Sequence, residues 1–215
     1  MFFDSKKQRE LMVEHQLKRR GIYDTRIINA FLEIPRENFI PEMERANAYE
    51  DGPVPIGHGQ TISQPYIVAL MTQLLDPKRT DQVLEIGAGS GYQSAILSRM
   101  VKNVTSVEII ASLAKSAQEN LDNLGIINVK VIHDDGSALI FKNKKFDKII
   151  VTAAAPEIPA IWIDLLKERG IIVIPEGNSF NQYLNTYQKI NGNLKKVGQS
   201  VGVRFVLLRG KEGFN

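Results

Sequence analysis

One short segment constrains the fold of this chain more than any other. The apolar run Val83–Ile86 is followed at once by Gly87, Gly89 and Gly91. This pattern is typical of a buried strand that enters a tight turn, because glycine allows positive φ and lets a ligand approach the backbone. The residues from Tyr92 to Val101 are expected to form a helix that begins at this turn, as in nucleotide-binding folds.

The spacing of the glycines indicates which kind of cofactor the turn holds. Dinucleotide-binding turns follow G-x-G-x-x-G, whereas this chain has G-x-G-x-G preceded by Glu85, which favours a cofactor without a pyrophosphate. The next apolar run ends in Glu108, where an acidic side chain can accept hydrogen bonds from ribose hydroxyls. Together these features predict an adenosine-containing ligand at Gly87, Ala88 and Gly89. The alternative is a strand-to-helix connection that binds nothing.

From residue 82 onward, strand-like runs alternate with helix-like segments. Strands are expected at residues 82–86, 104–108, 129–132, 146–152 and 170–174. This alternation predicts a doubly wound parallel α/β sheet. The tail has two further strand-like runs, at 183–190 and 194–208, on either side of a turn at 191–193. It predicts an antiparallel strand pair added to the sheet.

The N-terminal part of the chain has a different pattern. Helices are expected from Asp4 or Ser5 to Arg20, from Asp24 to Pro35, and over residues 66–75, with Ser63 as a candidate cap of the third helix. Prolines and glycines in segment 39–65 leave little room for long regular elements. Because this segment is also rich in apolar and aromatic residues, we expect an ordered, functional loop.

Composition limits the classes of function. With 215 residues, 43% hydrophobic and 24% charged, the chain can bury a sizeable core. It has no cysteine, and its three histidines lack metal-ligand spacing, so no metal site is expected. A net charge of +3, with the basic residues dispersed, does not require a nucleic-acid partner. No apolar stretch is long enough to span a membrane, so a cytoplasmic location is expected.

We interpret residues 1–215 as a single domain. Its expected parts are the N-terminal helices with a covering loop (1–81), a cofactor-binding core (82–175) and C-terminal strands (176–215). Ligands of doubly wound sheets bind beyond the carboxyl ends of the strands. In this region Asp135 could accept a hydrogen bond from an adenine amino group, or it could be a solvated carboxylate in a turn.

The loop at residues 152–156 limits which acceptor groups the site could methylate. Methyl transfer to an amino nitrogen would call for an Asn or Asp acceptor beside an aromatic ring, and this loop has neither. A carboxylate acceptor is already an anion and needs no general base, which fits a site without one. His58 is the only histidine near the expected site, and a structural or hydrogen-bonding role is favoured over a catalytic one.

Two longer motifs carry a resemblance to a known family. The runs Ala48–Tyr66 and Val151–Pro156 closely resemble the signature of protein-L-isoaspartate O-methyltransferases, and the likeness is to the bacterial type. It extends over most of the chain, through residues 12–13, 16–17, 20–22, 35–36, 83–92, 135–136 and 204–206.

The resemblance implies a specific activity and site. Members use S-adenosyl-L-methionine to methylate the α-carboxylate of L-isoaspartyl residues in damaged proteins and peptides, and the ester starts repair through a succinimide. The implied residues are Ser63 (catalytic, orienting the substrate carboxylate), His58 and Val206 (substrate-binding), and Gln60, Thr61, Ile62, Gly87, Ala88, Gly89, Glu108, Asp135 and Gly136 (cofactor-binding). Isoaspartyl proteins and peptides are the expected partners, with no nucleic acid or membrane, and a monomer is expected.

Two positions depart from the family pattern. Asp134 stands where glycine is common, which adds negative charge near the adenine, and Leu207 stands where proline is common, which leaves the path of the substrate-edge strand open. Two other functions stay open at this point. One is a methyltransferase for RNA or a small molecule, and the other is a cofactor-binding protein without catalysis.

Overall fold

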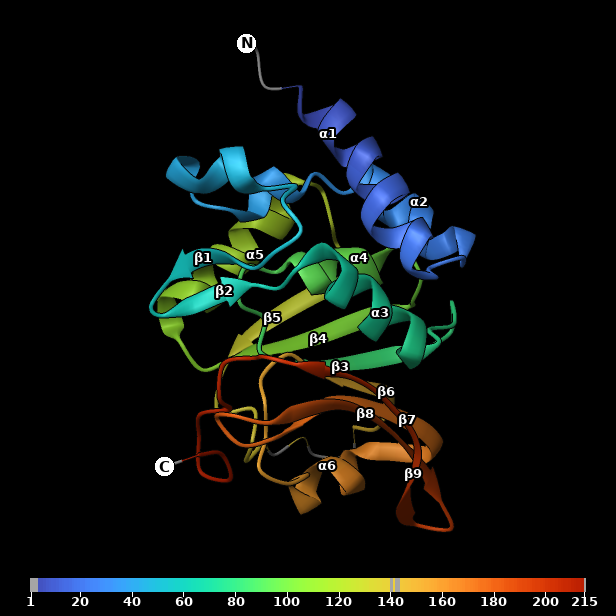
Figure 1. Ribbon diagram of the computed structural model, residues 1–215. Coiled ribbons are helices and arrows are strands. Elements are labelled where there is room, and N and C mark those ends of the chain that lie inside the picture. The colour runs from blue at the N-terminus through green and yellow to red at the C-terminus, as the bar shows by residue number, and fades with distance from the viewer. Residues whose placement is uncertain (1–3, 140, 142–143, 215) are drawn as a thin grey trace.

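A seven-stranded sheet forms the centre of the computed structural model, which describes residues 4–139, 141 and 144–214 (Figure 1). The strand order is β5-β4-β3-β6-β7-β8-β9, parallel from β5 to β7 and antiparallel for β8 and β9. The strands are β3 Gln82–Ile86, β4 Asn103–Glu108, β5 Val129–His133, β6 Phe146–Val151, β7 Leu166–Gly177, β8 Gln182–Ile190 and β9 Asn193–Val203. The predicted doubly wound sheet with an antiparallel addition is confirmed.

The predicted strands differ from the observed ones mainly at the C-terminal end. The strand expected at 170–174 is part of the longer β7, which is extended by its pairing with β8. Asn191 and Gly192 form the hairpin turn with φ values of 53° and 78°, the left-handed conformation that two-residue hairpins require. β9 ends at Val203 instead of continuing to residue 208, and Leu207 forms an isolated bridge with Ala154.

The two faces of the sheet are covered by different parts of the chain. Val83 and Ile150 pack into a core with the N-terminal helices, whereas Leu84 and Ile149 pack with Trp162 on the opposite face. α4 (Tyr92–Ser98) connects β3 to β4, and α5 (Ala111–Asn123) connects β4 to β5, so the strand order advances toward one edge of the sheet. α6 (Ala160–Leu165) connects β6 to β7, where the strand order advances toward the other edge. Because such crossovers are right-handed, the reversal puts α6 on the other face, as Figure 1 shows.

The helical N-terminal part agrees with the sequence pattern. α1 (Ser5–Met12) is capped by Asp4, and the chain stays helical through a π-helix (Val13–Leu17) and a 3₁₀ turn (Lys18–Arg20) until Gly21, at a φ of 89°. The Asp24 side chain caps α2 (Thr25–Glu33). No helix in the described part of the chain is long and apolar enough to cross a membrane.

Segment 39–65 contains a hairpin that the sequence pattern did not predict. Two 3₁₀ turns, Arg36–Phe39 and Glu42–Asn47, precede β1 (Val54–Gly57) and β2 (Gln60–Ile62), which pair with each other. The prolines of this segment indicated a loop, but a two-stranded ribbon tolerates proline where no partner needs its N–H. His58 and Gly59 close the hairpin with φ values of 54° and 71°.

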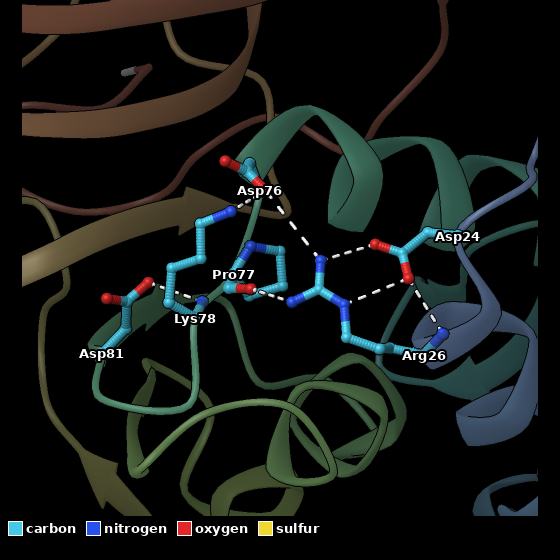
Figure 2. Close-up of polar contacts among 6 residues, drawn as sticks. All are labelled: Asp24, Arg26, Asp76, Pro77, Lys78 and Asp81. Atoms are coloured by element: carbon cyan, nitrogen blue, oxygen red, sulfur yellow. Dashed lines mark hydrogen bonds and ion pairs between the residues drawn. The ribbon is translucent and has the colours of Figure 1, made fainter.

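A polar network fastens α2 to the end of α3 (Pro65–Leu75), near the start of β3 (Figure 2). The Arg26 side chain donates to the Pro77 carbonyl oxygen at 2.8 Å and to Asp24 Oδ2 at 2.6 Å. Asp76, which ends α3 in a left-handed conformation, lies 4.0 Å from the same guanidinium. The network therefore lies at the amino ends of the strands, away from the glycine turn.

Candidate active site

The glycine turn has the backbone geometry that its sequence predicts. Gly87 follows β3 at a φ of 94°, and its N–H donates to the Val107 carbonyl oxygen at 2.8 Å. A Cβ at this position would lie 2.4 Å from Thr152 Oγ1. Gly91, at a φ of 88°, precedes α4, where a Cβ would lie 3.2 Å from the Ala117 carbonyl oxygen. Glycine is therefore required by both the backbone conformation and the close packing.

Glu108 joins this turn to the end of β4. Its Oε2 accepts a hydrogen bond from the Gly89 N–H at 2.8 Å, and its Oε1 accepts one from the Ile110 N–H at 3.0 Å. Each carboxylate oxygen can accept a second hydrogen bond. The largely buried Glu108 side chain also lines a cavity beside the turn, so it can accept hydrogen bonds from a diol there.

Two adjoining cavities lie beyond the carboxyl ends of the strands. We call the first, of about 90 Å³, the inner cavity. Ten of the predicted site residues line it: Gln60, Thr61, Ile62, Ser63, Gly87, Ala88, Gly89, Glu108, Gly136 and Val206. The second, of about 470 Å³, is the outer cleft, which runs between segment 61–67 and the C-terminal strands. Thr61, Ser63, Thr152 and Val206 line both, so these four residues mark where the two spaces meet.

The Ser63 side chain is not a helix cap. α3 begins at Pro65, the residue before it is Gln64, and no side chain caps this helix. The prediction of a Ser63 cap is wrong because proline at the first helical position needs no donor partner there. Among the described residues none forms a hydrogen bond with the Ser63 hydroxyl, which lies at the junction of the inner cavity and the outer cleft.

A buried arginine holds the Ser63 backbone. Arg36 Nη2 donates to the Ser63 carbonyl oxygen at 2.8 Å, and Arg36 Nε donates to the Ala48 carbonyl oxygen at 2.7 Å. The guanidinium carbon lies 5.0 Å from the centre of the Tyr92 ring, which directly follows the glycine turn. Burial lowers the pKa of Arg36 to about 10, so the side chain stays charged at neutral pH. Only the family motif pointed to this residue, since its contacts lie far apart in the sequence.

Asp135 and His58 do not line either cavity. Asp135 Oδ1 accepts from the Ser137 N–H and hydroxyl, and Oδ2 accepts from the Lys211 N–H at 2.8 Å. Burial opposes its ionisation, but these hydrogen bonds outweigh it and lower the pKa of Asp135. His58 is exposed at the tip of the β1–β2 hairpin, with Nε2 2.9 Å from Ser112 Oγ. The structure thus gives Asp135 and His58 positions in which they hold neighbouring segments together.

Gly136 reaches the inner cavity where Asp135 does not. Its carbonyl oxygen accepts a hydrogen bond from Trp162 Nε1 at 2.8 Å, and a Cβ there would lie 2.7 Å from Ile86 Cγ2. The buried Trp162 ring of α6 therefore sets the position of this loop from the opposite face of the sheet.

Comparison with known proteins shows which family has this sequence and fold. A family model described as Protein-L-isoaspartate(D-aspartate) O-methyltransferase matches residues 6–213. The chain belongs to this family. Two relatives are named Protein-L-isoaspartate O-methyltransferase. The one from Petrotoga mobilis is 45% identical over 98% of this chain and 100% of that protein, and the one from Geobacter metallireducens is 46% identical over 100% of this chain and 98% of that protein.

Solved structures of the protein-L-isoaspartate O-methyltransferase family share the whole fold. One is 32% identical with a TM-score of 0.85 and covers 95% of this chain and 67% of its own. Another, from Plasmodium falciparum, is described in complex with S-adenosyl-L-homocysteine. It is 32% identical with a TM-score of 0.79, and the match covers 95% of this chain and 98% of that protein.

One further buried group in this family member lies directly behind the glycine turn. Glu85 is fully buried in β3, and its Oε2 accepts hydrogen bonds from the hydroxyls of Ser94 and Ser106, the latter at 2.7 Å. Its Oε1 has no partner among the described residues. Burial raises the pKa of Glu85 to about 7, against the smaller opposing effect of the two serine hydroxyls. The side chain lines neither cavity, so its effect on a ligand is indirect.

Proposed function

We propose that this chain transfers a methyl group from S-adenosyl-L-methionine to the α-carboxylate of L-isoaspartyl residues in damaged proteins and peptides. The observation that carries this proposal is the junction of two cavities at Ser63, Thr61, Thr152 and Val206. A cofactor in the inner cavity and an acceptor in the outer cleft would meet at that junction. Family membership supplies the reaction class.

The residues of the inner cavity fit an adenosine-containing cofactor. Glu108 offers carboxylate oxygens to ribose hydroxyls, and Gly87, Ala88 and Gly89 leave the backbone open to close approach. Gly136 lines the same space, and we expect its backbone to contact the adenine. The contact expected from the Asp135 carboxylate stays a prediction. Gln60, Thr61 and Ile62 form the wall on the hairpin side.

The chemistry needs alignment more than acid–base catalysis. When bound, S-adenosyl-L-methionine supplies an electrophilic methyl group, and the acceptor oxygen forms a bond to that carbon as the carbon–sulfur bond breaks. A carboxylate is already deprotonated at neutral pH, so no side chain has to remove a proton. The Ser63 hydroxyl can donate to one carboxylate oxygen and turn the other toward the junction. Neither Asp, Glu, His nor Lys is among the described residues that line the outer cleft.

The product is a methyl ester, and repair then needs no further catalytic group. The neighbouring backbone nitrogen attacks the ester carbonyl, methanol leaves, and the succinimide that forms takes up water to give partly normal aspartate. We propose that the whole domain, residues 1–215, acts as one unit and as a monomer, which size-exclusion chromatography with light scattering would check. A cytoplasmic location stays an expectation.

The test uses two peptides that differ only in one residue. The protein is incubated with methyl-labelled S-adenosyl-L-methionine and either an isoaspartyl peptide or its normal aspartyl twin. Base-labile label on the isoaspartyl peptide alone supports the proposal. Label in RNA or in a small molecule, or cofactor binding without transfer to any acceptor, would contradict it.

A further inference from the structure

One side chain fixes the C-terminal wall of the outer cleft. β9 ends at Val203, which pairs with Gln182 of β8. Beyond that point the Gln182 side chain takes the place of a strand partner. Its Oε1 accepts from the Phe205 N–H at 2.6 Å, and its Nε2 donates to the Phe205 carbonyl oxygen at 3.1 Å.

The strip of residues 202–206 is therefore held from two sides. Gln182 is 5% exposed, and its Nε2 also donates to the Asn178 carbonyl oxygen at 3.1 Å. On the far side, the Val206 carbonyl oxygen accepts from the Ala154 N–H at 2.8 Å. Buried amide groups that are paired in this way are costly to release, so these contacts restrain the backbone of the strip at Phe205 and Val206.

This strip carries the only charge of the outer cleft. Among the described residues that line the cleft, Arg204 alone is charged at neutral pH. It is exposed, and no acceptor for its guanidinium is found in the described part of the chain. Arg20 and Arg99 are paired, at 3.2 Å from Asp51 and 3.3 Å from Glu33. The exposed Arg19, Arg45, Arg79, Arg169 and Arg209 have no acceptor among the described residues either, but none of them lines the outer cleft. A lone cation in an otherwise uncharged cleft attracts anions.

We propose that Arg204 is the anion-recognition residue of the outer cleft, that it binds a carboxylate of the substrate peptide, and that Gln182 is a positioning residue that acts through it. This inference rests on the proposed function. A guanidinium matches a carboxylate with two parallel N–H donors, whereas an ammonium does not. The carboxylate has two sources, the acceptor group itself and an acidic side chain next to the isoaspartyl residue.

The first experiment measures kcat and KM of the full chain with two isoaspartyl peptides, one flanked by alanine and one by glutamate. Arg204→Gln is expected to raise KM by about tenfold and to leave kcat within about twofold, because an exposed charge mainly affects capture. Arg204→Lys should recover part of the loss. If Arg204 binds the acceptor carboxylate, KM should rise equally for both peptides. If it binds a flanking carboxylate, KM should rise only for the glutamate-flanked peptide.

Salt dependence and a matched control separate recognition from a general charge effect. Arg79→Gln removes the same charge from an exposed position just before β3, at the opposite end of the sheet. Wild type and Arg79→Gln should lose kcat/KM as ionic strength rises, and Arg204→Gln should show a flatter dependence. An Arg204→Gln enzyme that matches Arg79→Gln in KM and in salt dependence would overturn the proposal.

The role of Gln182 is tested by coupling. Gln182→Leu is expected to raise KM as Arg204→Gln does, and the double variant should be no worse than the worse single variant, because both changes remove one interaction. Additive effects would contradict positioning through Arg204.

Failure of this inference can be told from failure of the proposed function. Peptide affinity is measured by calorimetry with S-adenosyl-L-homocysteine present, for wild type, Arg204→Gln and Arg79→Gln. About tenfold weaker binding in Arg204→Gln alone supports the role of Arg204 even if no methyl is transferred. Equal peptide affinity in all three proteins refutes it, whereas an active wild type upholds the proposed function.

Discussion

Replacing Glu85 with glutamine should change how the stability of this protein depends on pH. A glutamate in the unfolded chain has a pKa of about 4.5, and burial raises that of folded Glu85 to about 7. Between these values the folded state binds the proton and the unfolded state releases it. Stability contributed by this group is therefore complete below about pH 4.5 and falls as pH rises toward 7.

The magnitude follows from the pKa difference. One pKa unit corresponds to about 1.36 kcal/mol, so a difference of about 2.5 units corresponds to about 3 kcal/mol in the free energy of unfolding. Glutamine stays neutral at every pH and removes this slope. Its amide would place N–H donors at the Oε1 position, which has no partner among the described residues, at a pH-independent cost of about 1–3 kcal/mol. The test therefore depends on how the free energy of unfolding changes with pH, and not on its value at one pH.

Denaturant unfolding at pH 5, 6, 7 and 8 would measure this difference. Trp162 is the only tryptophan and is fully buried, so its fluorescence reports the global transition. The stability of Glu85→Gln relative to wild type should increase by about 2.5 kcal/mol between pH 5 and pH 8, since a smaller part of the effect is already present at pH 5. Glu108 is the other acidic group that acts on Glu85, and it is present in both proteins. Parallel stability curves, or a relative loss at high pH, would refute the reasoning.

Three further changes have expected outcomes. Ser63→Ala should lower kcat/KM for an isoaspartyl peptide by about 100-fold with cofactor affinity unchanged in calorimetry, because only the alignment of the acceptor is lost; full turnover would exclude this role. Gly87→Ala should destabilise the protein by about 1–3 kcal/mol and weaken cofactor binding, since its Cβ would lie 2.4 Å from Thr152 Oγ1 at a φ of 94°, and an unchanged melting temperature would contradict this. Glu168→Gln should speed deamidation in the 191–192 turn during storage, followed by peptide mass mapping, because the Glu168 carboxylate holds both backbone N–H groups at 2.6 and 3.1 Å; equal rates would rule out that protection.

Local patterns predicted the elements that local forces determine. The run Val83–Ile86 and the glycines after it are fixed by burial and by positive φ, so the strand, the turn and the following helix were all predicted. Glu108 was found for the same reason, since a parallel neighbour of β3 must end at the same edge of the sheet.

Side chains whose partners are distant in sequence could not be located from local patterns. The adenine contact of Asp135 stays a prediction, and the structure adds that the Lys211 N–H, 76 positions away, holds this carboxylate while Gly136 lines the inner cavity. The position of Ser63 before a helix predicts a cap, and the structure contradicts this. Pro65 removes the need for that cap, and Arg36 fixes the Ser63 backbone from another segment.

The junction of the two cavities shows why the reaction could be inferred from motifs but its geometry could not. Thr61 lies in β2 and Ser63 follows it, Thr152 follows β6, and Val206 follows β9, so three separate segments enclose one point. Each segment is fixed by a different contact: Arg36 holds Ser63, the Thr152 N–H donates to the Ile86 carbonyl oxygen, and Gln182 holds the strip before Val206. A methyl transfer that depends on alignment is therefore sensitive to residues that touch neither reactant, and only the folded chain reveals them.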